Sequence, residues 1–278
     1  MRNHTRVAGH FGELMQGRIG PDGPVALISL PCPILTVEAW HRPGRGLSIH
    51  GSGQRLVDPG RARRFLRLLG ADLSGSVRLR ATMPAGGGAG ASTASLVALA
   101  RLAAPDTSPM RLAAACLSCE GASDPLMFGA PERILWASRE GRILRRLPAL
   151  PRLDVLGGFL GPHRRTDPAD SAFPDISDLI VPWENAAEGG NLAKLAELAT
   201  VSARRTMTLR SGGSGAEDAL MKDLGALGFV IAHTGSLRGY LFAPGRIPTG
   251  ARAVLREAGY RGVLKFGVGG RGCPTRSF

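Results

Sequence analysis

One loop organises this chain: Pro84-Ala85-Gly86-Gly87-Gly88-Ala89-Gly90-Ala91-Ser92-Thr93. Before it, residues 77–83 alternate between apolar and polar side chains, as a half-buried strand does. After it, residues 92–104 are rich in alanine and leucine and end at Pro105, which predicts a helix. Glycines place no Cβ atoms in the way of a phosphate, and a helix start adds unpaired N–H groups and a positive dipole end. We therefore predict a phosphate-binding loop; the alternative, a flexible linker, is disfavoured by the regular elements on both sides.

Two common phosphate loops fit this segment poorly. The Walker A loop requires a lysine directly after its glycines, but the first lysine of this chain is Lys194. The dinucleotide pattern Gly86-x-Gly88-x-x-Ala91 is present, and Asp106 lies twenty residues beyond Gly86. In a dinucleotide-binding fold that acidic residue ends a second parallel strand, whereas Asp106 lies in a predicted turn. The dinucleotide interpretation is therefore weak.

The residues before the loop are rich in strand signals. Two short runs at 25–30 and 34–40 contain many β-branched and apolar residues, and Pro31 and Pro33 separate them. A helix is predicted over 58–69, because Asp58 is a good N-cap and a proline follows it.

A break with two prolines at 148–151 predicts a boundary between two domains, residues 1–150 and residues 151–278. Strands interrupted by pairs of helices favour an α+β fold over a long doubly wound sheet. The second domain is predicted to contain strand 153–160, helices 191–204 and 216–227, strands 228–233 and 238–242, helix 249–258 and strand 262–267.

The composition indicates a globular protein that does not bind nucleic acid. Hydrophobic side chains make up 44% and charged ones 21% of the 278 residues, as in ordinary folded domains. The formal net charge is +13, but only three of the 35 cationic residues are lysines. Such a skew indicates GC-rich coding, and the arginines are dispersed along the chain. Aromatic residues, at 5%, leave few platforms for stacking bases.

Targeting segments and metal motifs are not expected either. No apolar run reaches the length of about 18 residues that a membrane span requires, and residues 1–6 lead into no apolar segment of a secretory signal. We therefore expect a cytoplasmic protein with no membrane partner. Cys116 and Cys119 form a C-x-x-C without a second pair or a histidine at zinc spacing, so neither a disulfide nor a structural metal is expected.

Three segments, in order along the chain, carry a family resemblance. The first is Gly9-His10-Phe11-Gly12-Glu13-Leu14-Met15-Gln16-Gly17, the second is Pro84-x-x-x-Gly88-x-Gly90-x-Ser92, and the third is Lys265-Phe266-Gly267-Val268-Gly269-Gly270. The second resembles the ATP loop of the GHMP kinases, which include galactokinase and the homoserine, mevalonate and phosphomevalonate kinases. The first and third are similar to the L-threonine kinase branch, which serves the aminopropanol arm of cobalamin synthesis.

This resemblance implies a two-domain GHMP kinase fold of the α+β class, with an N-terminal ATP-loop domain and a C-terminal ferredoxin-like domain. It implies ATP and Mg²⁺ as cofactors and a small-molecule substrate, and the branch implies conversion of L-threonine to O-phospho-L-threonine by a monomer or a homodimer. Two alternatives remain open: another small hydroxylated acceptor, such as homoserine or a hydroxy acid, and a non-catalytic nucleotide-binding regulator.

The resemblance also implies roles for individual residues. Asp124 is expected to orient or deprotonate the acceptor hydroxyl, although Ser123-Asp124-Pro125 is also suitable for starting a helix. Ser92 is expected to hold Mg²⁺ together with Glu120 or, alternatively, Asp124. Ala91 stands where the family loop usually carries its first serine. The expected nucleotide-binding residues are Pro84, Gly86, Gly87, Gly88, Ala89, Gly90, Ala91, Ser92 and Thr93, and the expected substrate-binding residues are Glu13, Gln16, Gly267 and Gly269.

Overall fold

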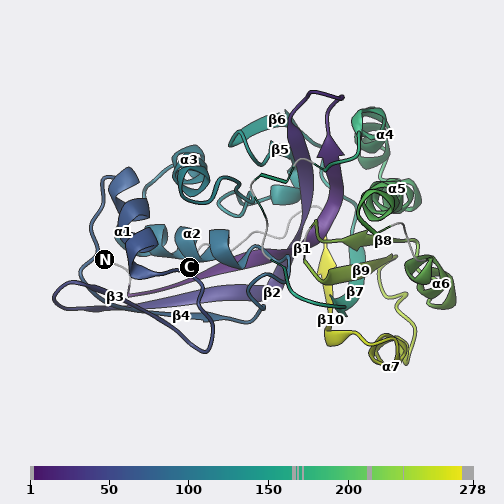
Figure 1. The fold of residues 1–278 in the computed structure, drawn as a ribbon. Helices are drawn as coiled ribbons and strands as arrows, with labels where there is room; N and C mark the ends of the chain where they lie inside the picture. Colours follow the sequence, from purple (N-terminus) through teal and green to yellow (C-terminus); the bar gives the residue numbers. More distant parts are fainter. Residues whose placement is uncertain are drawn as a thin grey trace.

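The computed structural model describes residues 3–164, 167, 169–170, 172–211, 215–233 and 235–270. Within these residues, ten strands form one connected sheet, with β10-β7-β9-β8-β1-β2-β4-β3 as its main order and β5 and β6 attached beside β2. Helices α1, α2 and α3 gather near the end of the sheet that holds β3 and β4, and α4 to α7 gather around the other end (Figure 1). The observed mixed architecture agrees with the predicted α+β class.

The elements have the following bounds. The strands are β1 (His4–Arg18), β2 (Val25–Pro43), β3 (Leu47–Gly51), β4 (Gly75–Ala81), β5 (Ile134–Ala137), β6 (Arg142–Arg146), β7 (Leu153–Phe159), β8 (Gly228–Ile231), β9 (Leu237–Phe242) and β10 (Arg261–Val268). The helices are α1 (Pro59–Leu68), α2 (Ala91–Ala103), α3 (Pro109–Glu120), the short 3₁₀ helix η1 (Pro131–Arg133), α4 (Ser177–Glu188), α5 (Leu192–Ser211), α6 (Ala216–Asp223) and α7 (Ala251–Glu257).

Two long antiparallel strands, β1 and β2, form the centre of the sheet. The prediction of two separate strands at 25–30 and 34–40 was wrong, because β2 continues through Pro31 and Pro33. A proline cannot donate to a neighbouring strand, and the pairing with β1 shifts register near these residues, between Ala8 and Gly9. The long strand therefore contains an irregularity instead of a break.

The helices pack on both ends of this central pair. Helix α2 lies against β1 and β2, where its alanines and leucines are buried, and α1 and α3 pack beside it. Helix α5 contacts β1 and β8, and α4 packs on α5. The predicted helices at 58–69, 92–104, 191–204, 216–227 and 249–258 are confirmed as α1, α2, α5, α6 and α7.

The predicted domain boundary near residue 150 lies in a coil between β6 and β7. The sheet continues across it, because Glu13 of β1 pairs with Ile231 of β8. A separate apolar cluster, which includes Leu156, Phe229 and Tyr260, lies wholly in the second half of the chain. The division into two domains stays a prediction.

Two further expectations concern membranes and cysteines. None of the helices in the described part of the chain combines the length and the apolar character needed to cross a bilayer. Cys32, Cys116 and Cys119 are free thiols, and Cys273 lies outside the described residues.

Candidate active site

The glycine loop turns sharply between β4 and α2. Gly86, Gly88 and Gly90 have φ of 77°, 84° and 73°, a backbone conformation that side chains with a Cβ rarely adopt. Gly90 is the N-cap of α2. Because glycine has no side chain, the cap residue makes no side-chain hydrogen bond to the first N–H groups of the helix. A turn of this kind before a helix start has the geometry that anion-binding sites commonly use.

Three backbone contacts hold this loop in place. The Ala85 N–H donates to the Gln54 side chain at 2.7 Å, the Arg164 N–H donates to the Gly86 carbonyl at 2.9 Å, and the His10 N–H donates to the Ala89 carbonyl at 3.2 Å. The last contact joins the loop to β1. Gln54 was not predicted as a site residue, because it lies in an irregular segment about thirty residues before the loop.

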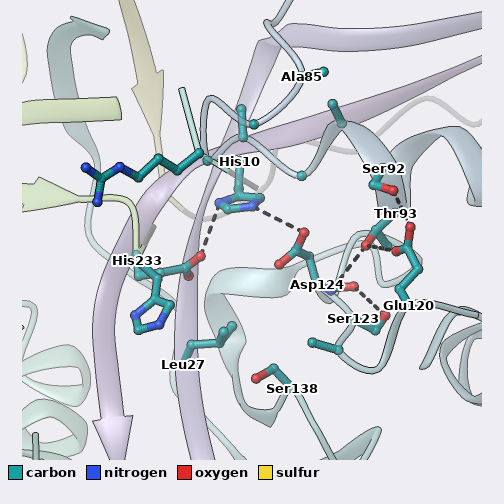
Figure 2. Close-up of a pocket in the computed structure, with 18 of the residues that line it drawn as sticks. His10, Leu27, Ala85, Ser92, Thr93, Glu120, Ser123, Asp124, Ser138 and His233 are labelled. Atoms are coloured by element: carbon teal, nitrogen blue, oxygen red, sulfur yellow. Dashed lines mark hydrogen bonds and ion pairs between the residues drawn. The ribbon is translucent and has the colours of Figure 1, made fainter. Parts of the chain in front are cut away.

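Ser92 and Thr93, in the first turn of α2, meet Glu120 at the end of α3 (Figure 2). The Ser92 hydroxyl donates to one carboxylate oxygen of Glu120, and the Thr93 hydroxyl donates to the other at 3.2 Å. Burial raises the pKa of Glu120, and these hydrogen bonds partly oppose that shift. Hydroxyl and carboxylate oxygens are the ligands that Mg²⁺ prefers, so the residues present fit the expected metal.

A bulge in β1 brings His10 and Glu13 to the same side of the strand. In a regular strand, residues three apart point to opposite faces. Here the register with β2 shifts on both sides of Glu13, and Gly12 between them has φ of 71°. Phe11 packs away from this group, against Phe266 of β10. Bulges of this kind often aim side chains into functional sites.

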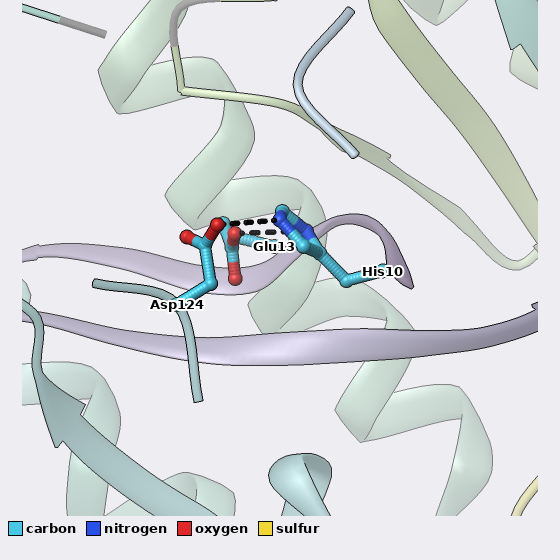
Figure 3. Close-up of side chains that lie close together, drawn as sticks. All are labelled: His10, Glu13 and Asp124. Atoms are coloured by element: carbon cyan, nitrogen blue, oxygen red, sulfur yellow. Dashed lines mark ion pairs between the residues drawn. The ribbon is translucent and has the colours of Figure 1, made fainter. Parts of the chain in front are cut away.

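His10 forms ion pairs with two carboxylates, those of Glu13 and Asp124 (Figure 3). Its Nδ1 is 3.2 Å from Glu13 Oε1, and its Nε2 is 3.5 Å from Asp124 Oδ2. Burial by itself would lower the pKa of His10, but the two carboxylates outweigh it and raise the pKa to about 9. Burial raises the pKa of Glu13 to about 7, against the attraction of His10.

The three side chains have ligand atoms within 4.8 Å of one another, a spacing that would also suit a metal ion. The carboxylates, however, flank opposite nitrogens of the ring. Nδ1 also lies 3.2 Å from the Gly12 carbonyl, which can only accept, so Nδ1 carries a proton. With Nδ1 protonated, only Nε2 could bind a metal, and the Glu13 oxygen faces the other nitrogen. The arrangement favours an imidazolium that donates to both acids.

Asp124 lies in the loop that follows α3. Within residues 121–130, all of which the structure describes, no helix begins at Pro125, so the alternative role of Asp124 as a helix cap was wrong. The Asp124 N–H is 3.5 Å from the Thr93 hydroxyl, and the Trp136 indole donates to the Ser123 carbonyl at 2.7 Å. These contacts hold the Asp124 carboxylate between His10 and the Glu120 group (Figure 2).

Gln16 lies on β1 three residues after Glu13 and is almost fully buried. Its side-chain NH₂ donates to the Ile231 carbonyl at 3.2 Å, and its Oε1 is 3.2 Å from Nδ1 of His233. Phe173 stacks on the His233 ring, with the ring centroids 4.0 Å apart. Gln16 and His233 thus meet at one end of the site.

The glycine loop, His10, Glu13, Gln16, Glu120, Asp124 and His233 line one cavity of about 350 Å³. Of the predicted site residues, the cavity lining contains Glu13, Gln16, Pro84, Gly86, Gly88, Ala89, Gly90, Ala91, Ser92, Thr93, Glu120 and Asp124. Gly87, also in the loop, is not part of the lining, and a Cβ there would be 2.8 Å from Pro84 and 2.9 Å from Phe159.

Gly267 and Gly269 do not line this cavity. Gly267 pairs with Asp154 of β7, and Gly269 lies against the Pro151 carbonyl. Their predicted role in substrate binding stays a prediction, and the structure places them at the β7–β10 edge of the sheet.

The cavity also contains cations that were not predicted as site residues. Arg55, Arg61 and Arg164 lie with the glycine loop in the lining, and Arg139 lies in the lining with Phe173. Arg61 is 3.6 Å from Glu120, and the Arg139 guanidinium stacks over Phe173 at 5.1 Å. In a sequence with 32 arginines, nothing local distinguishes these four from the rest.

Comparisons with known proteins extend this picture. No protein-family model matches the sequence, and no curated protein matches it. Among solved structures, a homoserine kinase from Cytophaga hutchinsonii is 16% identical with a TM-score of 0.64, covering 97% of this chain and 96% of its own. Mevalonate kinase from L. major is also 16% identical, with a TM-score of 0.62, covering 96% of this chain and 97% of its own.

A third structure is phosphomevalonate kinase from Streptococcus pneumoniae, in complex with phosphomevalonate and AMPPNP. It is 12% identical, with a TM-score of 0.64, and the match covers 96% of this chain and 99% of that one. Identities this low carry the fold alone, but the coverage extends over nearly the whole of each chain. The protein therefore has the α+β fold of the GHMP kinases.

Proposed function

We propose that this protein is an ATP-dependent kinase that phosphorylates the hydroxyl group of a small acceptor, and that the acceptor is L-threonine. One observation carries the proposal: the glycine loop, the Ser92–Glu120 oxygen group and the Asp124 carboxylate beside His10 line the same cavity of about 350 Å³. Phosphoryl transfer needs these three parts, because it depends on positioning and on neutralising charge.

The glycine loop and the start of α2 would bind the nucleotide phosphates through backbone N–H groups. Ser92 and Glu120 would hold Mg²⁺, because their oxygens already converge. When bound, this ion neutralises charge on the phosphates and on the transferring group. Arg61, at 3.6 Å from Glu120, is placed to add a further positive charge.

Asp124 would orient the acceptor hydroxyl and take its proton. A carboxylate is a weak base for an alcohol, but a late proton transfer suffices in a loose transition state. His10 donates to Asp124 at 3.5 Å and so fixes which oxygen remains available to the acceptor. This cation also offsets negative charge next to the loop.

The acceptor would occupy the part of the cavity beyond Asp124. L-Threonine carries an ammonium group and a carboxylate beside its hydroxyl. The buried carboxylate of Glu13 suits the ammonium, and Arg139 is a cationic donor in the lining that suits the carboxylate. The motif Gly9–Gly17, which contains Glu13 and Gln16, supports the threonine assignment within the fold.

The test measures ADP release from Mg-ATP with L-threonine, L-serine, homoserine, mevalonate, pantoate or no acceptor. We expect release that depends on L-threonine. Turnover with another acceptor only would keep the kinase and replace the substrate. ATP binding without turnover on any acceptor would contradict the kinase proposal and favour a nucleotide-binding regulator, for which Ala91 in the loop is the supporting observation.

A further inference from the structure

His233 lies just after β8 and lines the cavity beside Gln16 and Phe173. Its side chain is 14% exposed. Four groups surround the ring: Phe173 stacks on its face, Gln16 faces Nδ1, and Arg210 and Asp170 both face Nε2, at 2.6 Å and 3.3 Å. The mechanism proposed above gives this histidine no role.

The contacts determine which ring nitrogen carries the proton. The Ile231 carbonyl can only accept, so the Gln16 NH₂ must face it and Gln16 Oε1 must face His233. An amide oxygen can only accept, so Nδ1 of His233 carries the proton and donates. Arg210 can only donate, so Nε2 carries a lone pair that accepts from it.

The charges around the ring favour the same neutral state. Burial and the neighbouring Arg210 cation lower the pKa of His233 to about 3, and the nearby Asp170 opposes this only in part. The Asp170 carboxylate does not favour a proton on Nε2, because the Arg210 guanidinium contacts both Nε2 and the carboxylate. Arg139 is a further nearby cation and lowers this pKa as well.

We propose that His233 is a positioning residue for acceptor binding: its Nδ1–H holds the Gln16 amide so that the second N–H of that amide binds an oxygen of the acceptor. The inference rests on the proposed kinase function. Gln16 lines the cavity, and one of its two N–H groups is bonded to Ile231, so the second is its remaining donor. Ser202 fixes the Gln16 backbone from the other side, at 2.9 Å from its N–H.

Steady-state kinetics of three variants test this role. His233→Leu should raise the KM for the acceptor about tenfold and change kcat and the KM for ATP by less than about twofold, because only acceptor binding is affected. His233→Asn, whose amide N–H can replace Nδ1–H, should keep a KM close to that of the wild type. The double variant Gln16→Leu/His233→Leu should be no worse than Gln16→Leu alone, because His233 acts through Gln16.

His41→Leu is the matched control. His41 is buried and hydrogen-bonded to the Ser74 carbonyl, outside the cavity lining, so its loss should leave the acceptor KM unchanged. Additive losses in the double variant, or a fall in kcat with an unchanged acceptor KM in His233→Leu, would overturn the inference and leave the kinase proposal intact. Absence of turnover by the wild type would overturn both.

A second measurement needs neither a variant nor activity. Long-range ¹H–¹⁵N spectra of the wild-type protein distinguish the two neutral tautomers of histidine from its cation. We expect His233 to remain in the neutral Nδ1–H form from pH 5 to 8. An Nε2–H form, or a cation over this range, would show that Gln16 is not held as proposed.

Discussion

At the scale of single residues, His10 makes the folded state sensitive to pH. Its pKa rises from the usual 6.5 to about 9, so the folded protein binds this proton more tightly than the unfolded chain. The resulting stabilisation is complete below pH 6.5 and is lost as the pH rises through 9. It amounts to about 3 kcal/mol, at about 1.4 kcal/mol for each unit of pKa.

We expect the free energy of unfolding, measured with denaturant, to fall between pH 7 and pH 9 in the wild type. His10→Gln should show a much flatter profile over this range. Glu13 also has a raised pKa, of about 7, so in the wild type most of its contribution is lost at lower pH, from 4.5 to 7. Equal slopes for the two proteins above pH 7 would show that His10 is not the cation described here.

Asp124 is the residue on which the proposed chemistry depends most directly. Asp124→Asn keeps the size of the side chain but removes the negative charge and the base, so kcat should fall at least about tenfold. The same substitution should lower the pKa of His10, because the Asp124 carboxylate is one of the groups that raise it.

Asp22→Asn provides the control for this substitution, since Asp22 is exposed in the turn between β1 and β2 and should leave kcat unchanged. Circular dichroism would establish that both variants fold. Full activity of a folded Asp124→Asn protein would rule out the catalytic role.

Part of the candidate site could be predicted from the sequence because that part is local. Ser92 and Thr93 belong to the helix start that the glycines predict. Glu120 and Asp124 lie together in a short segment to which the family resemblance assigned roles. His10 is different: its role depends on a bulge and on a carboxylate more than a hundred residues away. His233 likewise acquires its partners only through folding, from Gln16 and Arg210.

At the scale of elements, the glycine loop is fitted closely to the turn between β8 and β9. A Cβ on Gly88 would lie 2.3 Å from the Ala232 Cβ, and the φ of Gly88 is 84°. Gly88→Ala should therefore lower the free energy of unfolding by about 1–3 kcal/mol and weaken ATP binding, because the loop must shift. Denaturation and nucleotide titration would measure the two effects.

The Gly245→Ala variant separates the cost of backbone strain from the cost of a steric clash. Gly245 has a similar φ of 73°, but a Cβ there would meet no atom within 4 Å. This variant should lose only about 1 kcal/mol of stability and bind ATP normally. Equal losses in the two variants would mean that the contact between the loop and Ala232 contributes nothing.

Some helices and strands were predicted from the sequence and others were not, for physical reasons. Helices α1 and α2 were found because each begins with clear local chemistry, Asp58 with a proline and the glycine loop. Helix α4 was not predicted, because Pro182 interrupts its pattern and polar residues precede it. The bulge in β1 was not predicted either, since the period of a strand is visible in sequence and a shift of register is not.

At the scale of the whole molecule, the candidate site joins parts of the chain that lie on both sides of residue 150. The glycine loop, Glu120 and Asp124 come from the first part, and Phe173 and His233 come from the second. The sheet makes the same connection through the Glu13–Ile231 pair. A ligand that fills the cavity would contact groups from both parts.

We therefore expect calorimetry to show a single unfolding transition, and expect Mg-AMPPNP to raise its midpoint. At a nucleotide concentration of about 100 times Kd the stabilisation is about 2.7 kcal/mol, which corresponds to a shift of about 5 °C or more for a chain of this size. Mg²⁺ alone should shift the midpoint far less, because the phosphates supply most of the contacts. Two transitions, of which only one moved with nucleotide, would instead indicate two domains that unfold independently. In that case the Glu13–Ile231 pair would connect the two domains without making them unfold together. The cavity would then lie at the interface between the domains.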